Sequence, residues 1–306
     1  MTTRPFPPGL VPLGNLVGVK RRYSVTADVL GFRRCARQYG AFRIYKYAPA
    51  EQTQLFYGTI VHQVLDRAHA HFHGVINPAL RGTLPTDSEI EGYFNEVEKG
   101  LRSRGIRKGS GSERDRALRV LKHFNSLEGP TLYPRVVDTE HRLQADNGDH
   151  LLFGVVDLLV WDPAAATSAG ACEIWDYKGS RRLYMTTKEL EAYEFQMRVY
   201  AHLYERRHGV RPSKAVLYFL NELDFASAPT SRPVNAVFEV DLSPREVARA
   251  VAEFSATVRQ IDVSRGIDQW PAPPTTDVSL QTCTVCDLRW DCPTGTLHGA
   301  ANSLFP

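Results

Sequence analysis

An acidic and a basic side chain are spaced to act together in the segment Asp176-Tyr177-Lys178. The apolar residues around this segment predict a β-strand, and a strand turns alternate side chains to the same face. Asp176 and Lys178 therefore share one face, with the carbonyl of Tyr177 between them, whereas Glu173 points to the opposite face. An Asp-x-Lys pair also occurs on ordinary strands with a solvated face, so this segment alone leaves both interpretations open.

A second carboxylate, Asp157, ends the Gly-Val-Val-Asp segment 154–157. If its strand lies beside the first, both carboxylates reach one ion, and oxygen ligands of this kind suit Mg²⁺ or Mn²⁺ rather than zinc. Such an ion lowers the pKa of its bound water and neutralises charge in a phosphodiester transition state. Lys178 would hold the attacking water in place and stabilise the negative charge of the phosphate in the transition state. Asp157, Asp176 and Lys178 together therefore predict phosphodiester hydrolysis.

Two further polar residues lie on the helix expected after this strand. Thr186, with Glu189 three residues later, forms a capping box, and Gly209 is a typical C-terminal stop. Within this helix Gln196 and Tyr200 are four residues apart and project from one face, where an amide and a phenol could grip a phosphate or order the water. Core packing is the alternative for Tyr200.

A histidine on an earlier helix could be a further metal ligand. His62 lies on the polar side of a helix predicted over residues 58–72. A helical histidine is also common on a solvated surface, and the neighbouring His69, His71 and His73 are expected to be exposed in this way.

Five cysteines occur in the chain, an odd number, and the proline-broken N-terminal segment has no pattern of an export signal. They indicate a reducing interior, and hence the cytoplasm, where thiols serve metals or packing rather than disulfides. One thiol lies far upstream at Cys35, and three lie close together at Cys283, Cys286 and Cys292. Cys172, in the strand before the Asp-Tyr-Lys segment, is expected to be a buried packing thiol.

Composition and charge exclude some classes of protein and leave others open. The 306 residues are 43% hydrophobic with a formal charge of +3, and no apolar run approaches the roughly 18 to 20 residues that span a bilayer. Cations concentrate in the helical stretch 89–127, where they could line a channel for a single nucleic-acid strand. Interspersed acids make a solvated helical face the alternative. The cations are Arg102, Arg104, Arg107, Lys108, Arg114, Arg116, Arg119 and Lys122.

The remaining pattern predicts an α/β protein with a central mixed sheet flanked by helices. Helices are expected from Ser24, with Thr26 as N-cap, and over 58–72, 89–127 and 243–261. Strands are expected over 137–143, 151–160, 172–178, 215–221 and 234–241. The expected parts are an N-terminal helical segment at 24–80, a basic helical insertion at 81–130, the core at 131–265 and a C-terminal cysteine segment at 266–306.

The order of these segments resembles that of the PD-(D/E)xK nucleases of the RecB branch: His62, then 154–157, then Asp176-Tyr177-Lys178, then Gln196 and Tyr200. The resemblance implies a restriction-endonuclease-like fold with a helical insertion. It implies that Asp157, Asp176 and Lys178 are catalytic, and that Gln196 and Tyr200 contact DNA. Glu140 sits where many members have an acid. The implied ligands of Mg²⁺ or Mn²⁺ are His62, Asp157, Asp176 and Tyr177.

The cysteine pattern is similar to that of the iron-sulfur variants of this branch, the AddB-type subunits and the CRISPR adaptation nucleases, in which one cysteine precedes the nuclease core and three follow it. It implies a 4Fe-4S cluster that closes the N- and C-terminal segments onto each other. Zinc is the alternative, although Cys₄ zinc sites usually have two paired knuckles and only one pair exists here. Ala36 follows the first cysteine, where many members have proline. The implied cluster ligands are Cys35, Cys283, Cys286 and Cys292.

Together these features predict a divalent-metal-dependent deoxyribonuclease that acts on single-stranded DNA or DNA ends, as an exonuclease in preference to an endonuclease. The sequence contains no P-loop motif, so a helicase partner in repair, recombination or phage defence is expected by analogy with the family. Two alternatives stay open, a catalytically silent nucleic-acid-binding subunit of a larger complex and a zinc-bound interaction module.

Overall fold

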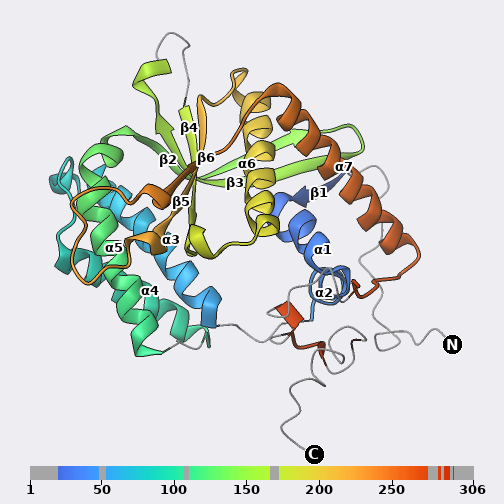
Figure 1. Ribbon diagram of the computed structural model, residues 1–306, viewed down its shortest axis with the longest axis horizontal. Coiled ribbons are helices and arrows are strands. Elements are labelled where there is room, and N and C mark those ends of the chain that lie inside the picture. Colours follow the sequence, from blue (N-terminus) through green and yellow to red (C-terminus); the bar gives the residue numbers. More distant parts are fainter. Residues whose placement is uncertain are drawn as a thin grey trace, which may run out of the picture. The chain divides into compact units, whose positions relative to one another are not determined.

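A computed structural model gives the fold of the chain (Figure 1) and describes residues 20–47, 53–106, 110–165, 172–274, 282–283, 286–289 and 292. Contacts divide the chain into two units. The core unit comprises Glu51–Ala145 and Phe153–Val251, and the terminal unit comprises Met1–Ala50, Asp146–Leu152 and Ala252–Pro306.

Three helices form one layer of the core unit: α3 (Thr53–Phe72), α4 (Asp87–Ser103) and α5 (Gly111–Leu132). Complete capping boxes begin the last two, because the Thr86 and Ser110 hydroxyls accept bonds from backbone N–H groups three residues on and the glutamates there bond back. The apolar faces of the three helices meet in one hydrophobic cluster with the sheet. In Figure 1 these helices gather on one side of the strands.

A mixed sheet is the centre of the fold. The long strands β2 (Val136–Asp146) and β3 (His150–Trp161) pair with each other through a short turn, in which Gly148 adopts φ +90°. β4 (Cys172–Lys178) runs antiparallel to β3 and parallel to β5 (Lys214–Phe219), and the short β6 (Val237–Glu239) is antiparallel to β5. The sheet order is β1-β3-β4-β5-β6, with β2 on β3.

The helix α6 (Thr187–His208) connects the parallel strands β4 and β5, as a parallel pair requires. The predicted capping box of Thr186 and Glu189 is present, and Gly209 ends the helix in the left-handed conformation with φ +76°. Trp175 and Tyr177 of β4 pack in the cluster with α3 and α5, whereas Asp176 bonds to α6. Helices therefore cover both faces of the sheet, which confirms the predicted α/β fold.

The terminal unit contains β1 (Arg21–Ser24), which is next to β3 in the sheet order, and a run of short helical turns that includes α1 (Gly31–Arg34) and α2 (Ala36–Tyr39). The first turn is a π-helix, Val25–Leu30, whose cap is Ser24 rather than the predicted Thr26. Ser24 takes this role because its backbone is extended and its hydroxyl accepts bonds from Ala27 N and Asp28 N. Most of α7 (Pro244–Gly266) also belongs here.

Two further predictions about single elements were wrong. His69 and His71 are buried, not exposed, because α3 turns them inward: His69 lies 3.3 Å from the Tyr177 hydroxyl, and His71 lies 2.8 Å from that of Tyr93. The last strand is shorter than expected, since a 3₁₀ turn at Val234–Ala236 occupies its start. No helix among the described residues is long and apolar enough to cross a membrane.

Candidate active site

The strands β3 and β4 bring the two predicted carboxylates together. Their antiparallel register pairs Leu158 with Trp175, so the next step along both strands sets Asp157 opposite Asp176. Opposite residues of an antiparallel pair point to the same face. Asp157 Oδ2 also accepts a 2.8 Å hydrogen bond from the backbone N–H of Tyr177. The register therefore brings both acids to one face of two adjacent strands, and their side chains make different contacts: Asp157 bonds to the backbone of Tyr177, and Asp176 bonds to Gln196 and pairs with Lys178.

Two other elements add donors beside Asp157. His62 of α3 places Nδ1 3.3 Å from Asp157 Oδ2, and Glu140 of β2 completes a set of three ligand atoms that all lie within 4.8 Å of one another. Across the part of the chain that the structure describes, this is the one such set of three or more. Glu140 adopts φ +50°, a strained conformation for a residue with a side chain, and such strain often marks functional sites.

Asp176 is held in a second group, next to the first. Gln196 Nε2 donates to Asp176 Oδ1 at 2.6 Å, Lys178 Nζ lies 2.6 Å from Asp176 Oδ2, and Lys178 Nζ donates to Gln196 Oε1 at 3.0 Å. Gln196 Nε2 also reaches the Tyr200 hydroxyl at 3.1 Å. One amide thus holds the acid, the lysine and the phenol in a fixed geometry.

The burial of Gln196 and Tyr200 bears on their predicted role. Both are almost fully buried in the structure, where they orient Asp176 and Lys178. Their contact with DNA stays a prediction. Gly154 shows why the motif begins with glycine, since a Cβ there would lie 2.5 Å from the Tyr200 ring.

The electrostatics of the site favour a bound cation. Burial, and then the neighbouring Asp176 carboxylate, raise the pKa of Asp157 well above its usual range, and burial followed by Asp66 and Asp176 raises the pKa of Glu140. Burial lowers the pKa of His62, which leaves a neutral imidazole available as a ligand. Asp176 Oδ2 is buried and accepts no directed hydrogen bond, although Lys178 Nζ is close.

The donor set passes a chemical test for a divalent ion. The carboxylates of Asp157, which is partly buried, and of Glu140, which is exposed, lie close enough to repel one another, and a cation between them would relieve that repulsion. Oxygen donors with one imidazole suit Mg²⁺ or Mn²⁺. The structure places His62, Asp157 and Glu140 in one set, and turns Asp176 toward Lys178 instead.

Lys178 carries a positive charge at neutral pH. Burial, the largest single influence, lowers its pKa, but the charge and hydrogen bond of Asp176 together with Tyr193 and Asp157 raise it, and the net shift is upward. The ammonium also lies 4.0 Å from the centre of the Tyr193 ring. Tyr193 was not singled out from the sequence, and its position three residues before Gln196, on the same helix face, was the available signal.

The predicted DNA channel is less favoured than the alternative. Several of its cations pair with acids of the core unit: Arg114 with Glu98 at 3.3 Å, Arg119 with Asp224 at 2.6 Å and Lys122 with Glu91 at 3.0 Å. Residues 107–109, which include Arg107 and Lys108, lie outside the described residues. Paired cations are less available to phosphates, so the solvated helical face fits better here.

The four other predicted ligands, the cysteines, come together in the terminal unit. Cys35, Cys283, Cys286 and Cys292 are all buried. Burial raises the pKa of the Cys35 thiol, and the nearby thiols of Cys286 and Cys292 raise it further. Cys172, in the core unit, is buried as predicted.

Comparison with known proteins points to one family. The family described as the PD-(D/E)XK nuclease superfamily matches residues 24–293. The chain is similar to a protein from Eubacterium rectale provisionally described as an exonuclease, with 13% identity over 79% of this chain and 80% of that chain and a TM-score of 0.48. It is also similar to the protein SSO0001, with 14% identity over 91% and 89% of the two chains and a TM-score of 0.36. No curated protein matches significantly.

Proposed function

Since the chain belongs to the PD-(D/E)XK nuclease superfamily, we propose that it is a divalent-metal-dependent deoxyribonuclease. It hydrolyses phosphodiester bonds of single-stranded DNA or of DNA ends, as an exonuclease in preference to an endonuclease. The observation that carries this proposal is the set of His62, Glu140 and Asp157 directly beside the Asp176–Lys178 pair.

The proposed roles follow from the geometry of the side chains. His62, Glu140 and Asp157 hold Mg²⁺ or Mn²⁺, with Asp176 and the Tyr177 carbonyl as the further ligands inferred from the sequence. The bound ion supplies Lewis-acid chemistry and an acidified water. Asp176, Gln196 and Tyr200 lie in one hydrogen-bonded group that orients Lys178.

Lys178 acts as a donor rather than as a base. Its pKa is raised by Asp176 despite burial, so the side chain keeps its protons at neutral pH. A protonated amine can hold the attacking water by a hydrogen bond and can stabilise the extra negative charge that develops on the phosphate. Its fixed position means that little reorganisation is needed during the reaction.

We further propose that Cys35, Cys283, Cys286 and Cys292 hold a structural 4Fe-4S cluster, as in the iron-sulfur members of the RecB-like branch. The burial of all four thiols, and the influence of Cys286 and Cys292 on the pKa of Cys35, support one shared metal centre, and the resemblance to the iron-sulfur variants favours a cluster over a single zinc ion. Hydrolysis requires no electron transfer, so the cluster serves to join the segments that bear its ligands.

Unwinding of duplex DNA by ATP hydrolysis must come from outside these residues, because the sequence contains no P-loop. The family resemblance therefore supports a helicase as a working partner, in repair, recombination or defence against foreign DNA. Co-purification of an ATP-dependent helicase with the tagged protein tests this proposal.

Replacing Lys178 by alanine tests the nuclease proposal. Protein purified without oxygen is incubated with end-labelled single- and double-stranded DNA and Mn²⁺, Mg²⁺ or a chelator. Lys178→Ala should lower the cleavage rate by about 10²- to 10³-fold and leave DNA binding nearly unchanged. Lys214→Ala, an exposed lysine on the neighbouring β5, is the matched control and should cut normally. DNA binding without any metal-dependent cutting by the wild-type protein would instead identify a silent binding subunit.

A further inference from the structure

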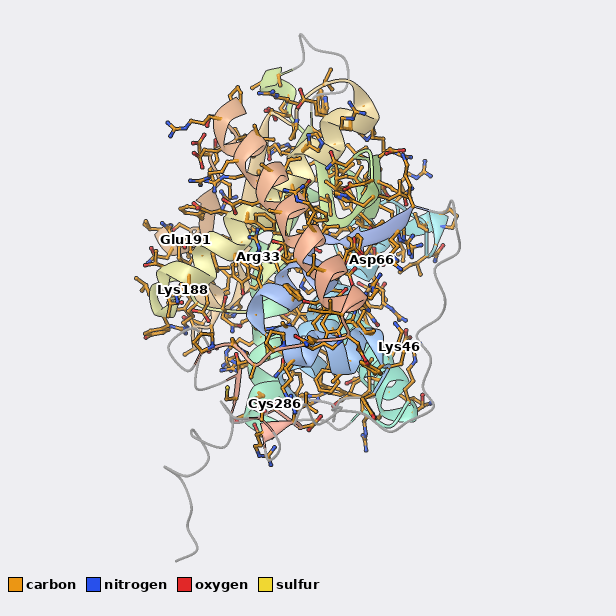
Figure 2. The ribbon with its side chains drawn as sticks, turned by 90° about the vertical axis from the view of Figure 1, so that its right-hand side faces the viewer. Arg33, Lys46, Asp66, Lys188, Glu191 and Cys286 are labelled. Atoms are coloured by element: carbon orange, nitrogen blue, oxygen red, sulfur yellow. The ribbon has the colours of Figure 1, made fainter. Side chains whose placement is uncertain are left out.

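Asp66 is an acidic residue of α3 that has no part in the proposed mechanism so far. It is labelled in Figure 2 and lies four residues after His62, a spacing that puts two side chains on the same face of a helix. Its Oδ1 accepts a 2.5 Å hydrogen bond from the hydroxyl of Thr139 on β2. Thr139 directly precedes Glu140, the proposed metal ligand of that strand. One face of α3 therefore reaches both the metal site and the strand that carries Glu140.

The strand β2 changes face at Glu140. Thr139 bonds to α3, whereas the ring centre of His141 lies 5.7 Å from that of His208 at the end of α6. Residues two apart in a regular strand point to the same face, but α3 and α6 cover opposite faces of this sheet. The left-handed conformation of Glu140, with φ +50°, accounts for the change, as in a β-bulge that redirects a side chain. From this position the Glu140 carboxylate reaches the metal site.

The conformation of Glu140 needs support from outside the strand. A residue with a side chain is strained in the left-handed region, and such strain persists only where surrounding contacts fix it. The bond from Thr139 to Asp66 fixes the residue immediately before the strained one. Charge does not explain the position of Asp66, because after burial its carboxylate is the largest influence that raises the pKa of Glu140. Two carboxylates that face each other are unfavourable without a cation, so the arrangement fits a metal site.

We propose that Asp66 is a positioning residue for Glu140: through the Thr139 hydroxyl it holds β2 in the conformation that presents the Glu140 carboxylate to the divalent ion. This role rests on the proposed nuclease function and adds a residue that does not itself touch the metal. The helix α3 then supplies one ligand directly, His62, and sets the position of another. Removal of an outer residue of this kind typically weakens metal binding by about 10- to 100-fold.

Calorimetric titration of Mn²⁺ into the full chain, without DNA, tests this role. Thr139→Val removes the hydroxyl and Asp66→Ala removes its acceptor, and each should weaken Mn²⁺ binding by at least about tenfold. Thr139→Ser keeps the hydroxyl and Asp66→Asn keeps an oxygen acceptor, so both should bind Mn²⁺ within about threefold of the wild type. Asp115→Ala, which removes an exposed acid of α5, is the control and should bind Mn²⁺ normally.

A double variant shows whether the effect passes through Glu140. If Asp66 acts only on Glu140, adding Asp66→Ala to Glu140→Gln should weaken Mn²⁺ binding further by less than about twofold. A further loss of about tenfold would show that Asp66 acts independently, as a direct ligand, and would overturn the positioning role. Weak binding in Asp66→Asn together with normal binding in Thr139→Val would overturn it in the same way.

The outcomes separate this role from the proposed enzyme. Unchanged Mn²⁺ affinity in Asp66→Ala and Thr139→Val would overturn the positioning role and leave the nuclease proposal, and a lower melting temperature of the metal-free variants would then make the bond a purely structural one. A wild-type protein that binds Mn²⁺ in an Asp66-dependent way but cuts no DNA would support the positioning role and overturn the enzyme. A wild-type protein that binds neither Mn²⁺ nor Mg²⁺ would overturn both.

Discussion

The Lys178 ammonium is surrounded by three kinds of partner: the Asp176 carboxylate, the Gln196 amide and the Tyr193 ring. The carboxylate keeps the amine protonated, and the amide fixes its direction. The ring adds a contact that needs no hydrogen bond and attracts the ammonium through its electron-rich face. At the scale of single residues, the proposed mechanism therefore depends on how firmly these partners hold the Lys178 ammonium.

Tyr193 is a positioning residue for Lys178. Replacement by leucine should lower kcat by about five- to thirtyfold, which corresponds to a cation–π contribution of about 1 to 2 kcal/mol, with little change in KM. Replacement by phenylalanine keeps the ring and should restore most of kcat. Steady-state kinetics on labelled single-stranded DNA measures both constants. A Tyr193→Phe variant as slow as Tyr193→Leu would show that the ring is not the source of the effect.

Glu140 is expected to be a direct metal ligand, because its carboxylate shares one set with His62 and Asp157. Glu140→Gln should raise the Mn²⁺ concentration for half-maximal cleavage by at least about tenfold, and calorimetric titration should show weaker Mn²⁺ binding. Asp138→Asn, an exposed carboxylate two residues earlier on the same strand, is the control. Equal Mn²⁺ affinity in both variants would remove Glu140 from the ligand set.

At the scale of elements, α3 presents a proposed metal ligand on one face and a buried histidine on another. His62 lies beside Asp157 in the proposed metal site, whereas His69, two turns later, is buried against Tyr133 and Tyr177. Nδ1 of His69 has no hydrogen-bond partner, so a proton there would be buried without compensation. Burial accordingly lowers the pKa of His69 to about 3.

His69 should make the core unit sensitive to acid. The unfolded chain binds this proton near pH 6.5 and the folded chain only near pH 3, so the stability that neutral His69 contributes is complete above pH 6.5 and is lost as the pH falls between these values. The free energy of unfolding, measured with urea from pH 7 to pH 4, should decrease as the pH falls. This decrease should be smaller in His69→Gln than in the wild type, by up to about 1.4 kcal/mol per pH unit. If the free energy of unfolding of the variant and of the wild type depended on pH in the same way, His69 would not be the source of the acid sensitivity.

The helix α6 packs closely against the strand β3 where Tyr200 meets Gly154. Tyr200 packs its ring where a side chain at Gly154 would have to lie, and its hydroxyl meets Gln196. The approach of helix to strand therefore sets the position of the amide that orients Asp176. The glycine at the start of the Gly-Val-Val-Asp segment serves packing, and through packing it serves the site.

At the scale of the whole molecule, the chain divides into a unit that holds the candidate catalytic residues and a unit that holds the four cysteines. The four cysteines proposed as cluster ligands come from segments that are far apart in sequence, at Cys35 and at Cys283 to Cys292. Cross-linking such distant segments removes much of the freedom of the unfolded chain. The cluster is thus expected to stabilise the terminal unit.

Loss of one cysteine should remove the cluster. Anaerobically purified wild-type protein should be brown, absorb near 400 nm and contain about four iron atoms per chain. Cys35→Ser should lose most of the iron and unfold at a lower temperature. Cys172→Ser replaces the one cysteine outside the set and should keep the iron. If elemental analysis of the wild-type protein found zinc and no iron, the four cysteines would hold a zinc ion and the proposed cluster would be wrong.

Local patterns in the sequence determined much of this protein. The two-residue period of β4 put Asp176 and Lys178 on one face, because strand geometry alone decides that alternation. Thr186, Glu189 and Gly209 marked both ends of α6, because caps satisfy backbone groups within a few residues. The motif order indicated the nuclease superfamily, which the family match confirms.

Only the tertiary structure decided which of these residues meet. His62, Glu140 and Asp157 come from three different elements, and the periodicity of each element gives no information on whether their ligand atoms come together. The inward turn of His69, and the burial of Gln196 and Tyr200, also depend on which faces the sheet and helices cover. The physical reason is that periodicity encodes the face on which a side chain lies, whereas packing between distant segments decides what that face touches.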